Sequence, residues 1–107
     1  MLRLEYTGMS MYDVLAAPQR RAILDLLRAG PRHVGELVEQ LQASQPTVSK
    51  QLRVLREAGL VVVRAQGQQR VYALDPRPLQ ELDAWLQPYR ALWAGRLDAL
   101  EAVLDAS

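Results

Sequence analysis

The chain has 107 residues, half of them hydrophobic, and a formal net charge of +1 at pH 7. This length fits one compact domain with its own core and leaves little for a second domain, and the apolar content excludes a disordered tail. The absence of cysteine excludes disulfides and thiolate metal sites. The single histidine, His33, excludes a site built from several histidines of one chain.

The sequence contains no run of about 18 apolar residues, the length that predicts a membrane span. Residues 1–6 also lack the apolar stretch of a signal peptide. We therefore expect a cytoplasmic protein with no membrane partner. Residues 1–9 are expected to be a loose extension, because Met9 and Met11 are both alternative starts.

The charged residues are unevenly distributed. Residues 44–72 carry five basic side chains and one acidic side chain, whereas residues 73–107 carry three basic and six acidic ones. A basic middle beside an acidic end is what a local anion-binding face would produce. Chance segregation explains the same distribution equally well, so the charge pattern alone decides nothing.

Two helices are predicted in the first 30 residues. The first covers residues 12–17 and ends at Pro18, which then suits the first turn of the second helix, where its missing N–H is no loss. The second covers residues 19–29, with Ile23, Leu26 and Leu27 on one face. Gly30 and Pro31 stop it.

Residues 34–58 have the pattern of a helix-turn-helix. Apolar residues spaced i, i+3, i+4, i+7 predict a short helix over residues 34–41. Ser44 is a good N-cap for the following helix, Pro46 suits its first turn, and Gly59 suits its end. Two short helices joined by so brief a turn predict a helix-turn-helix.

Residues 60–74 have the pattern of a β-hairpin. The β-rich runs 60–64 and 70–74 are joined by the polar loop 65–69, in which Gly67 is expected to take a positive φ. Alternation places Val61 and Val63 opposite Tyr72 and Leu74 on the core side. A hairpin that follows a helix-turn-helix is interpreted here as a wing, and its outward-facing residues are Val62 and Val71.

Residues 77–105 are predicted to be a helix with an apolar seam at alternating steps of three and four, as in coiled coils. Pro88 is expected to kink or divide it. The seam either packs within its own subunit or forms a dimer interface, and two Trp and one Tyr favour the interface. The predicted interface comprises Leu15, Leu79, Leu82, Leu86, Tyr89, Trp93, Leu97 and Leu100.

The helix after Ser44 has polar first turns on the side away from its apolar stripe. Helix-turn-helix proteins insert this part into the major groove, where Gln pairs with adenine and Lys or Arg with guanine. An ordinary solvated helix face is the alternative, but the preceding helix and the following hairpin favour DNA. A two-fold dimer would place two such helices about one duplex turn apart on a palindromic site. The predicted DNA-binding residues are Gln45, Pro46, Thr47, Ser49, Lys50, Arg53 and, on the wing, Arg64 and Arg70.

Several stretches resemble the ArsR-type winged-helix repressors, in their cysteine-free branch. These are residues 18–27 (PQRRAILDLL), 34–37 (VGEL), 44–61 (SQPTVSKQLRVLREAGLV), 82–86 and 93–100. The resemblance covers residues 12–104. It implies a homodimer joined mainly through the first and last helices, which represses a promoter that often includes its own.

The chain departs from this family's pattern at three places. Metal-sensing members carry ligands in the third or last helix, whereas residues 32–37 contain no thiol, so His33 is interpreted as a helix-entry residue and neither metal nor cofactor is expected. Gln42 stands where relatives often have Gly, at a cost of roughly 1 kcal/mol if the site needs a positive φ. The loop 65–69 lacks basic residues, which lowers the expected phosphate contact of the wing.

The sequence therefore predicts a mainly α fold with a small β-hairpin, a winged helix-turn-helix whose flanking helices form a dimer interface, within one domain of residues 1–107. The expected function is a dimeric, sequence-specific DNA-binding regulator that represses its own or a neighbouring promoter and senses no metal; its effector is unknown. The alternative is a winged-helix module that binds protein. An enzyme is not expected, because no carboxylate pair, nucleophile with a base or Gly-rich phosphate loop is present. Asp83, Asp98 and Glu101 are interpreted as a solvated acidic face.

Overall fold

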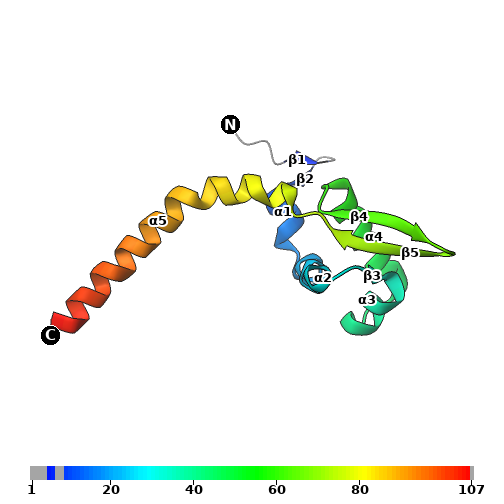
Figure 1. The fold of residues 1–107 in the computed structure, drawn as a ribbon, viewed down its shortest axis with the longest axis horizontal. Helices are drawn as coiled ribbons and strands as arrows, with labels where there is room; N and C mark the ends of the chain where they lie inside the picture. Colours follow the sequence, from blue (N-terminus) through cyan, green and yellow to red (C-terminus); the bar gives the residue numbers. More distant parts are fainter. Residues whose placement is uncertain (1–4, 7–8, 107) are drawn as a thin grey trace.

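A computed structural model describes residues 5–6 and 9–106 (Figure 1). Its helices are α1 (Met11–Ala16), α2 (Pro18–Ala29), α3 (Val34–Leu41), α4 (Gln45–Glu57) and α5 (Arg77–Ala106). Its strands are β1 (Glu5–Tyr6), β2 (Met9–Ser10), β3 (Arg32–His33), β4 (Val61–Gln66) and β5 (Gln69–Leu74). The predicted fold class, a mainly helical winged helix-turn-helix with a small β-hairpin, is confirmed.

The wing is a three-stranded antiparallel sheet in the order β3-β5-β4. Its register pairs Val61 with Leu74 and Val63 with Tyr72, which confirms the predicted core-side pairs. The predicted five-residue loop is wrong, because the ladder continues to Gln66 and Gln69 and leaves a two-residue turn. Gly67 has φ 63° there, as expected, and such a conformation lets a two-residue turn follow the twist of the strands.

Part of the expected N-terminal extension is ordered into strands. β1 and β2 pair antiparallel, with Tyr6 opposite Met9, and Met9 packs against the core. The expectation of a loose extension is therefore wrong for Glu5, Tyr6 and Met9. For residues 1–4 and 7–8 it lies outside the described part of the chain.

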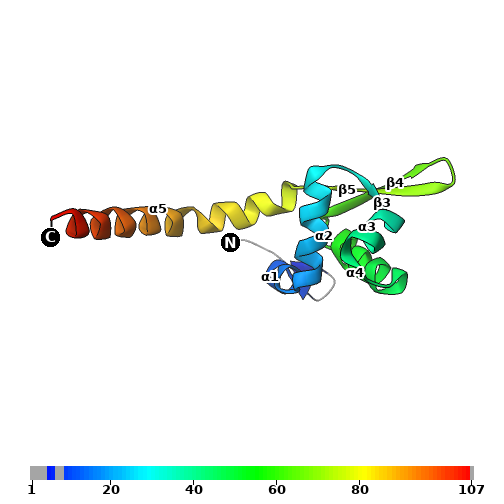
Figure 2. The ribbon, with the colours of Figure 1, turned by 90° about the horizontal axis from the view of Figure 1, so that it is seen from below.

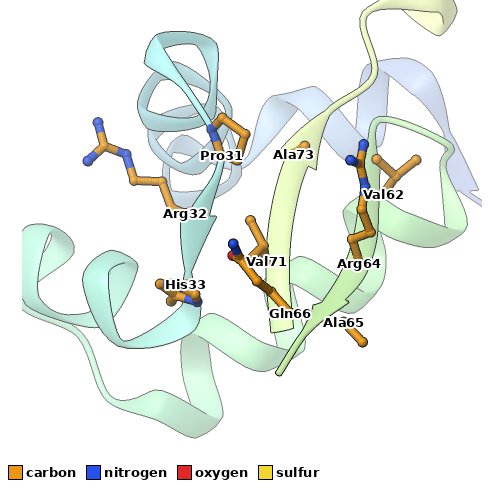
Figure 3. Close-up of a pocket in the computed structure, with 9 residues that line it drawn as sticks. All are labelled: Pro31, Arg32, His33, Val62, Arg64, Ala65, Gln66, Val71 and Ala73. Atoms are coloured by element: carbon orange, nitrogen blue, oxygen red, sulfur yellow. The ribbon is translucent and has the colours of Figure 1, made fainter. Parts of the chain in front are cut away.

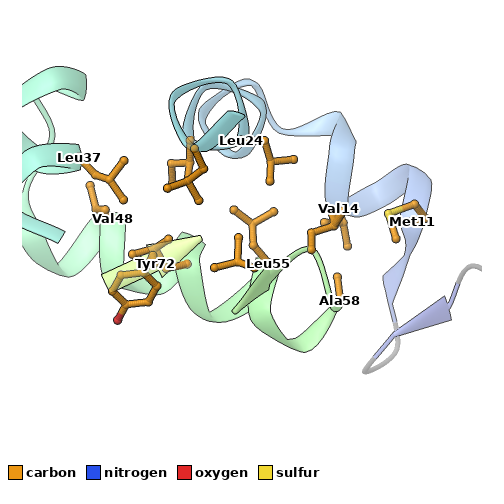
Figure 4. Close-up of a cluster of buried hydrophobic side chains, with 13 residues drawn as sticks. Met11, Val14, Leu24, Leu37, Val48, Leu55, Ala58 and Tyr72 are labelled. Atoms are coloured by element: carbon orange, nitrogen blue, oxygen red, sulfur yellow. The ribbon is translucent and has the colours of Figure 1, made fainter. Parts of the chain in front are cut away.

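One hydrophobic core joins α1, α2, α3, α4 and the wing (Figure 4). The predicted inward stripe of α4 forms its centre, and Val48, Leu52 and Leu55 are at most 1% exposed. Burying these side chains is the main driving force that holds α4 against the other helices. The core consists of Met11, Val14, Ile23, Leu24, Leu27, Leu37, Val48, Leu52, Leu55, Ala58, Leu60, Val61 and Tyr72.

The turn between α3 and α4 confirms two predictions from the sequence. Gln42 caps α3 in the left-handed region, with φ 53° and ψ 40°, and its N–H bonds back to the carbonyls of residues 38 and 39. The Ser44 side chain accepts a hydrogen bond from the Thr47 N–H at 3.3 Å and so caps α4. These two residues set the angle between α3 and α4.

Replacing Gln42 with Gly should raise the free energy of unfolding by about 0.5–1 kcal/mol, because Gly adopts this left-handed conformation without strain. The matched control is Gln40→Gly, which places the same substitution within α3 and should lower stability by about 1 kcal/mol. Urea denaturation at one fixed protein concentration measures both changes. A destabilised Gln42→Gly variant would show that the left-handed cap is not strained.

Helix α5 starts at a rigid corner after β5. The Asp75 N–H donates to the Leu60 carbonyl at 2.8 Å, and the Asp75 carboxylate accepts from the backbone N–H of Arg77 at 3.1 Å. The Arg77 guanidinium also lies 2.6 Å from this carboxylate. These hydrogen bonds from Arg77 hold the pKa of Asp75 below its usual value. The first turn of α5 is therefore fixed to the wing.

Helix α5 is a single helix of 30 residues with Pro88 inside it, so Pro88 does not divide it. The helix instead bends part-way along, in accordance with the expected kink (Figure 1). It runs away from the winged-helix body and leaves its C-terminal half far from the core (Figure 2). Among the residues described here, no helix combines the length and the apolar character needed to cross a membrane.

Candidate nucleic-acid interface

The outer face of α4 is polar and basic. Its side chains Gln45, Pro46, Ser49, Lys50 and Arg53 are exposed, on the side away from the buried stripe. Six of the eight predicted DNA-binding residues lie on this helix, and five of the six are exposed.

Thr47 differs from the other predicted residues of α4. It is half-buried, and its Oγ1 atom lies 2.7 Å from the Ser44 Oγ atom. Its backbone N–H is also bound to the same hydroxyl. Thr47 is therefore part of the N-terminal cap of α4, and its hydroxyl is already hydrogen-bonded to that of Ser44.

Two grooves border this face of α4. The first, of about 510 Å³, lies between α4 and β5, and the second, of about 800 Å³, lies between α3, α4 and the wing. Ser49, Arg70 and Tyr72 line both of them. The structure thus brings Arg70 of the wing beside the α4 residues Gln45, Ser49 and Arg53.

Among the lining residues outside the predicted DNA-binding set are one arginine and two glutamines: Arg56, Gln68 and Gln69. Arg56 follows Ser49 and Arg53 at the i, i+4, i+7 spacing of one helix face, so the sequence did carry a signal for it. The two glutamines lie at the end of the hairpin. The sequence placed both in a five-residue loop, so their position beside the groove was not predicted.

Arg53 has an acidic neighbour on its own helix. Its Nε atom donates to the Glu57 carboxylate at 3.3 Å, and the Arg53 side chain is 81% exposed. Exposed pairs at this spacing contribute only about 0.3–0.5 kcal/mol. Arg53 can therefore leave Glu57 for a phosphate or a base at little cost.

Arg64 borders the pocket that Val62 and Val71 also line (Figure 3), and the strand register places Arg70 on the opposite face of the wing. Arg64 pairs with Val71 across the hairpin, whereas Arg70 pairs with Ala65, so the two side chains alternate. This pocket is shallow, with a volume of about 420 Å³, and lies on the outer face of the sheet, where Val62 is 43% exposed. The structure does not bring Arg64 together with the α4 face.

His33 joins the wing to α3. Its Nδ1 atom lies 3.3 Å from the Arg70 carbonyl oxygen, a contact that links the start of α3 to β5. Its backbone N–H donates to the Glu36 carboxylate at 3.0 Å, at the start of α3. These contacts fit a helix-entry residue. Within residues 5–6 and 9–106, no cluster of three or more His, Asp or Glu side chains could hold a metal ion.

The predicted dimer residues fall into two groups. Leu15 and Leu79 pack against the core of their own subunit, and Leu82 and Leu86 are half-buried. The others are exposed by 44–65%: Tyr89, Trp93, Leu97 and Leu100. Four residues of α5 outside the predicted interface extend this surface: Trp85, Leu92, Val103 and Leu104. The C-terminal half of the seam therefore does not pack within its own subunit.

An aromatic cluster connects α1 to α5. The rings of Tyr12 and Trp85 meet edge-on with centroids 5.8 Å apart, and Trp85 lies 5.0 Å from Tyr89. Tyr12 is itself 46% exposed. The first and last helices thus present one continuous apolar surface, which sequence spacing within a single helix could not reveal.

Comparisons with known proteins agree with this geometry. Residues 17–63 match the family profile described as bacterial regulatory protein, arsR family. The chain is 40% identical to the HTH-type transcriptional regulator Rv2034 of Mycobacterium tuberculosis over 95 residues, which cover 89% of this chain and 86% of that protein. The chain belongs to the ArsR family.

Other ArsR-family proteins extend the comparison. The transcriptional repressor SdpR of Bacillus subtilis is 31% identical over 72% of this chain and 86% of its own length. A crystal structure of the ArsR family transcriptional regulator RHA00566 superposes with a TM-score of 0.68, at 32% identity, over 78% of this chain and 87% of that one.

A solution structure matches the same architecture. It is the homodimeric winged helix-turn-helix DNA-binding domain Mb0332 of Mycobacterium bovis, with a TM-score of 0.59 and 31% identity over 73% of this chain and 72% of that one. This ArsR-family chain is accordingly a transcriptional regulator with a DNA-binding winged helix-turn-helix, and its family is not one of enzymes.

Proposed function

We propose that this ArsR-family protein is a homodimeric, sequence-specific repressor that binds a palindromic operator in its own or a neighbouring promoter, in the cytoplasm and without sensing a metal. The observation that carries the proposal is the exposed polar and basic face of α4, with Arg70 of the wing beside it across the groove. A relative of similar length, SdpR, is named a transcriptional repressor.

The α4 face has the chemistry that the major groove requires. Gln45 offers an amide that pairs with adenine, and Lys50 and Arg53 offer donors for guanine or phosphate. Ser49 and Arg70 border the same grooves, and we expect them to contact the sugar-phosphate backbone. Because α4 is already folded and packed on the core before DNA binds, little conformational entropy is lost when this face binds DNA.

The apolar surface of α5 and α1 supports the dimer. Exposed side chains as large as Trp93 and Leu97 cost free energy in water, and a second copy of the chain would cover them. The related domain Mb0332 is described as homodimeric. A two-fold axis through this surface would present two α4 helices to one duplex.

The lack of cysteine and the single, structurally engaged His33 support metal independence. Carboxylates without histidine make a weak site for a transition metal. Operator affinity should therefore be the same in the presence of a chelator and of added Zn²⁺, and a change of tenfold or more would contradict this part of the proposal.

Replacing Lys50 or Arg53 with Ala should weaken operator binding by roughly 5- to 150-fold, because each loses a base or phosphate contact. Both residues are exposed, so the thermal midpoint should stay within a few degrees. The measurement is a binding titration on a site selected from genomic fragments of the host. If the contact is to phosphate, the slope of log affinity against log salt should also fall by about one.

The charge-matched control is Arg28→Ala. Arg28 is exposed on the last turn of α2, outside the residues that line the two grooves. This variant should bind the operator within about twofold of wild type, since surface changes away from the interface have small effects. Equal losses for Arg28 and Arg53 would mean that α4 is the wrong face. No shift of any genomic fragment at low salt would favour a protein-binding module.

A further inference from the structure

Two arginines of α2 bind the C-terminal end of α1. The last four carbonyls of a helix have no partner within that helix. In α1 these carbonyls belong to residues 13–16. Arg20 donates to those of Asp13 (2.9 Å) and Val14 (2.7 Å), and Arg21 donates to those of Leu15 (2.8 Å) and Ala16 (2.9 Å). All four open carbonyls of α1 are therefore bound by positive charge from α2, which also suits the helix dipole.

Arg20 makes one further hydrogen bond, to a side chain of α4. Its remaining Nη1 group donates to the Gln51 side-chain oxygen of α4 at 2.8 Å, and the contact is partly buried. One planar guanidinium thus holds α1 and α4 at once, with three donors in a fixed fork. The network joins the helix that carries Tyr12, in the apolar surface, to the helix that carries the DNA face.

Gln51 does not belong to the DNA face itself. Residues two positions apart on a helix point about 200° apart, so Gln51 faces α1 and α2 while Arg53 faces the groove. Gln51 is half-buried and lies outside the residues that line the two grooves at α4. An effect of Gln51 on DNA binding must therefore pass through the position of α4.

We infer that Arg20 is a positioning residue: through Gln51 it fixes the orientation of α4 relative to α1, and so couples the apolar dimer surface to sequence recognition. The inference rests on the proposed function. Packing of Val48, Leu52 and Leu55 holds α4 against the core. Small rotations and translations of α4 still cost little free energy, because apolar contacts have little directionality. The charge-assisted hydrogen bond from Arg20 to Gln51 is directional and therefore fixes the orientation of α4 at one point.

The test compares operator and random-sequence DNA for wild type and Gln51→Met, which keeps the length and helix propensity of the side chain but removes the acceptor. Operator affinity should fall by about 3- to 10-fold, the net contribution of one typical hydrogen bond, while affinity for random DNA stays within about twofold. The thermal midpoint should change by only a few degrees. A merely structural role would lower the midpoint and leave the ratio of the two affinities unchanged.

The matched control is Arg21→Ala, which removes cap bonds of α1 without touching α4. It should lower the thermal midpoint and keep the ratio of operator to random affinity. In a double-mutant cycle, Arg20→Met with Gln51→Met should reduce that ratio no further than Arg20→Met alone. The inference is overturned if Gln51→Met keeps the wild-type ratio, or if the two effects are additive. If wild type itself shows no preference for any genomic fragment, the proposed function fails instead, and this inference with it.

Discussion

Replacing Leu97 with Glu should convert the protein to a monomer at micromolar concentration. Leu97 is 65% exposed in one subunit and lies in the middle of the apolar face of α5. A two-fold axis would bury two copies of the substitution, each leaving a carboxylate unpaired. The loss of a central interface residue costs about 2 kcal/mol or more per copy, so the dimer dissociation constant should rise by roughly 1,000-fold.

Operator binding should fall with the dimer. A monomer contacts one half-site only, so affinity for the full operator should decrease by about 100-fold or more while weak binding to a single half-site remains. Sedimentation velocity gives the oligomeric state, and a titration with both DNA lengths gives the affinities.

The matched control for Leu97→Glu is Ala94→Glu. Position 94 lies on the same exposed helix, about 60° around the helix from position 97 and toward the acidic side marked by Asp98 and Glu101. The control should remain dimeric. A Leu97→Glu variant that sediments as a dimer with wild-type operator affinity would show that this surface of α5 is not the interface.

Replacing Leu55 with Ala should lower the free energy of unfolding by about 2–5 kcal/mol. Leu55 is 0% exposed and packs at the centre of the core, between α4, α2 and the wing. The substitution removes buried apolar surface and leaves a cavity, in a domain whose total stability is only about 5–15 kcal/mol. Part of the protein should then be unfolded at 37 °C, with a matching loss of active DNA-binding protein.

Val62→Ala is the control for this change. Val62 is a similar aliphatic residue on the outer face of the wing, 43% exposed, and its truncation should cost no more than about 1 kcal/mol. Urea denaturation must use one protein concentration, because dimerisation adds to the apparent stability. Equal effects at the two positions would mean that α4 is not held by the core described above.

Features set by local physics could be predicted from the sequence. Ser44 as an N-cap and the pairing of Val61 with Leu74 follow from the residue types and the local pattern, whereas the left-handed site at Gln42 was indicated by the resemblance to relatives with Gly there. The turn of the wing was mispredicted because residues 65–69 lack the apolar alternation that marks a strand. The ladder nevertheless extends through Gln66 and Gln69, since each added pair forms backbone hydrogen bonds and Gly67 permits a tight turn.

Features that depend on contacts between elements could not be predicted. The strand β3 has only two residues, which are too few for an alternation of apolar and polar side chains, and it forms by pairing with β5. That Arg20 reaches Gln51, or that Tyr12 meets Trp85, depends on how whole helices pack. The opposite orientation of Arg64 and Arg70 follows from strand alternation, but only once the length of the turn is known.

The most direct test of the central claim is a chemical protection footprint of wild-type protein on its selected operator. Two copies of α4 in successive major grooves should protect two segments related by a dyad, with centres about one helical turn (about 10 bp) apart. The Arg53→Ala variant should lose both segments together at concentrations where wild type protects them. A single protected segment, or two segments without dyad symmetry, would contradict a dimer that recognises DNA through α4.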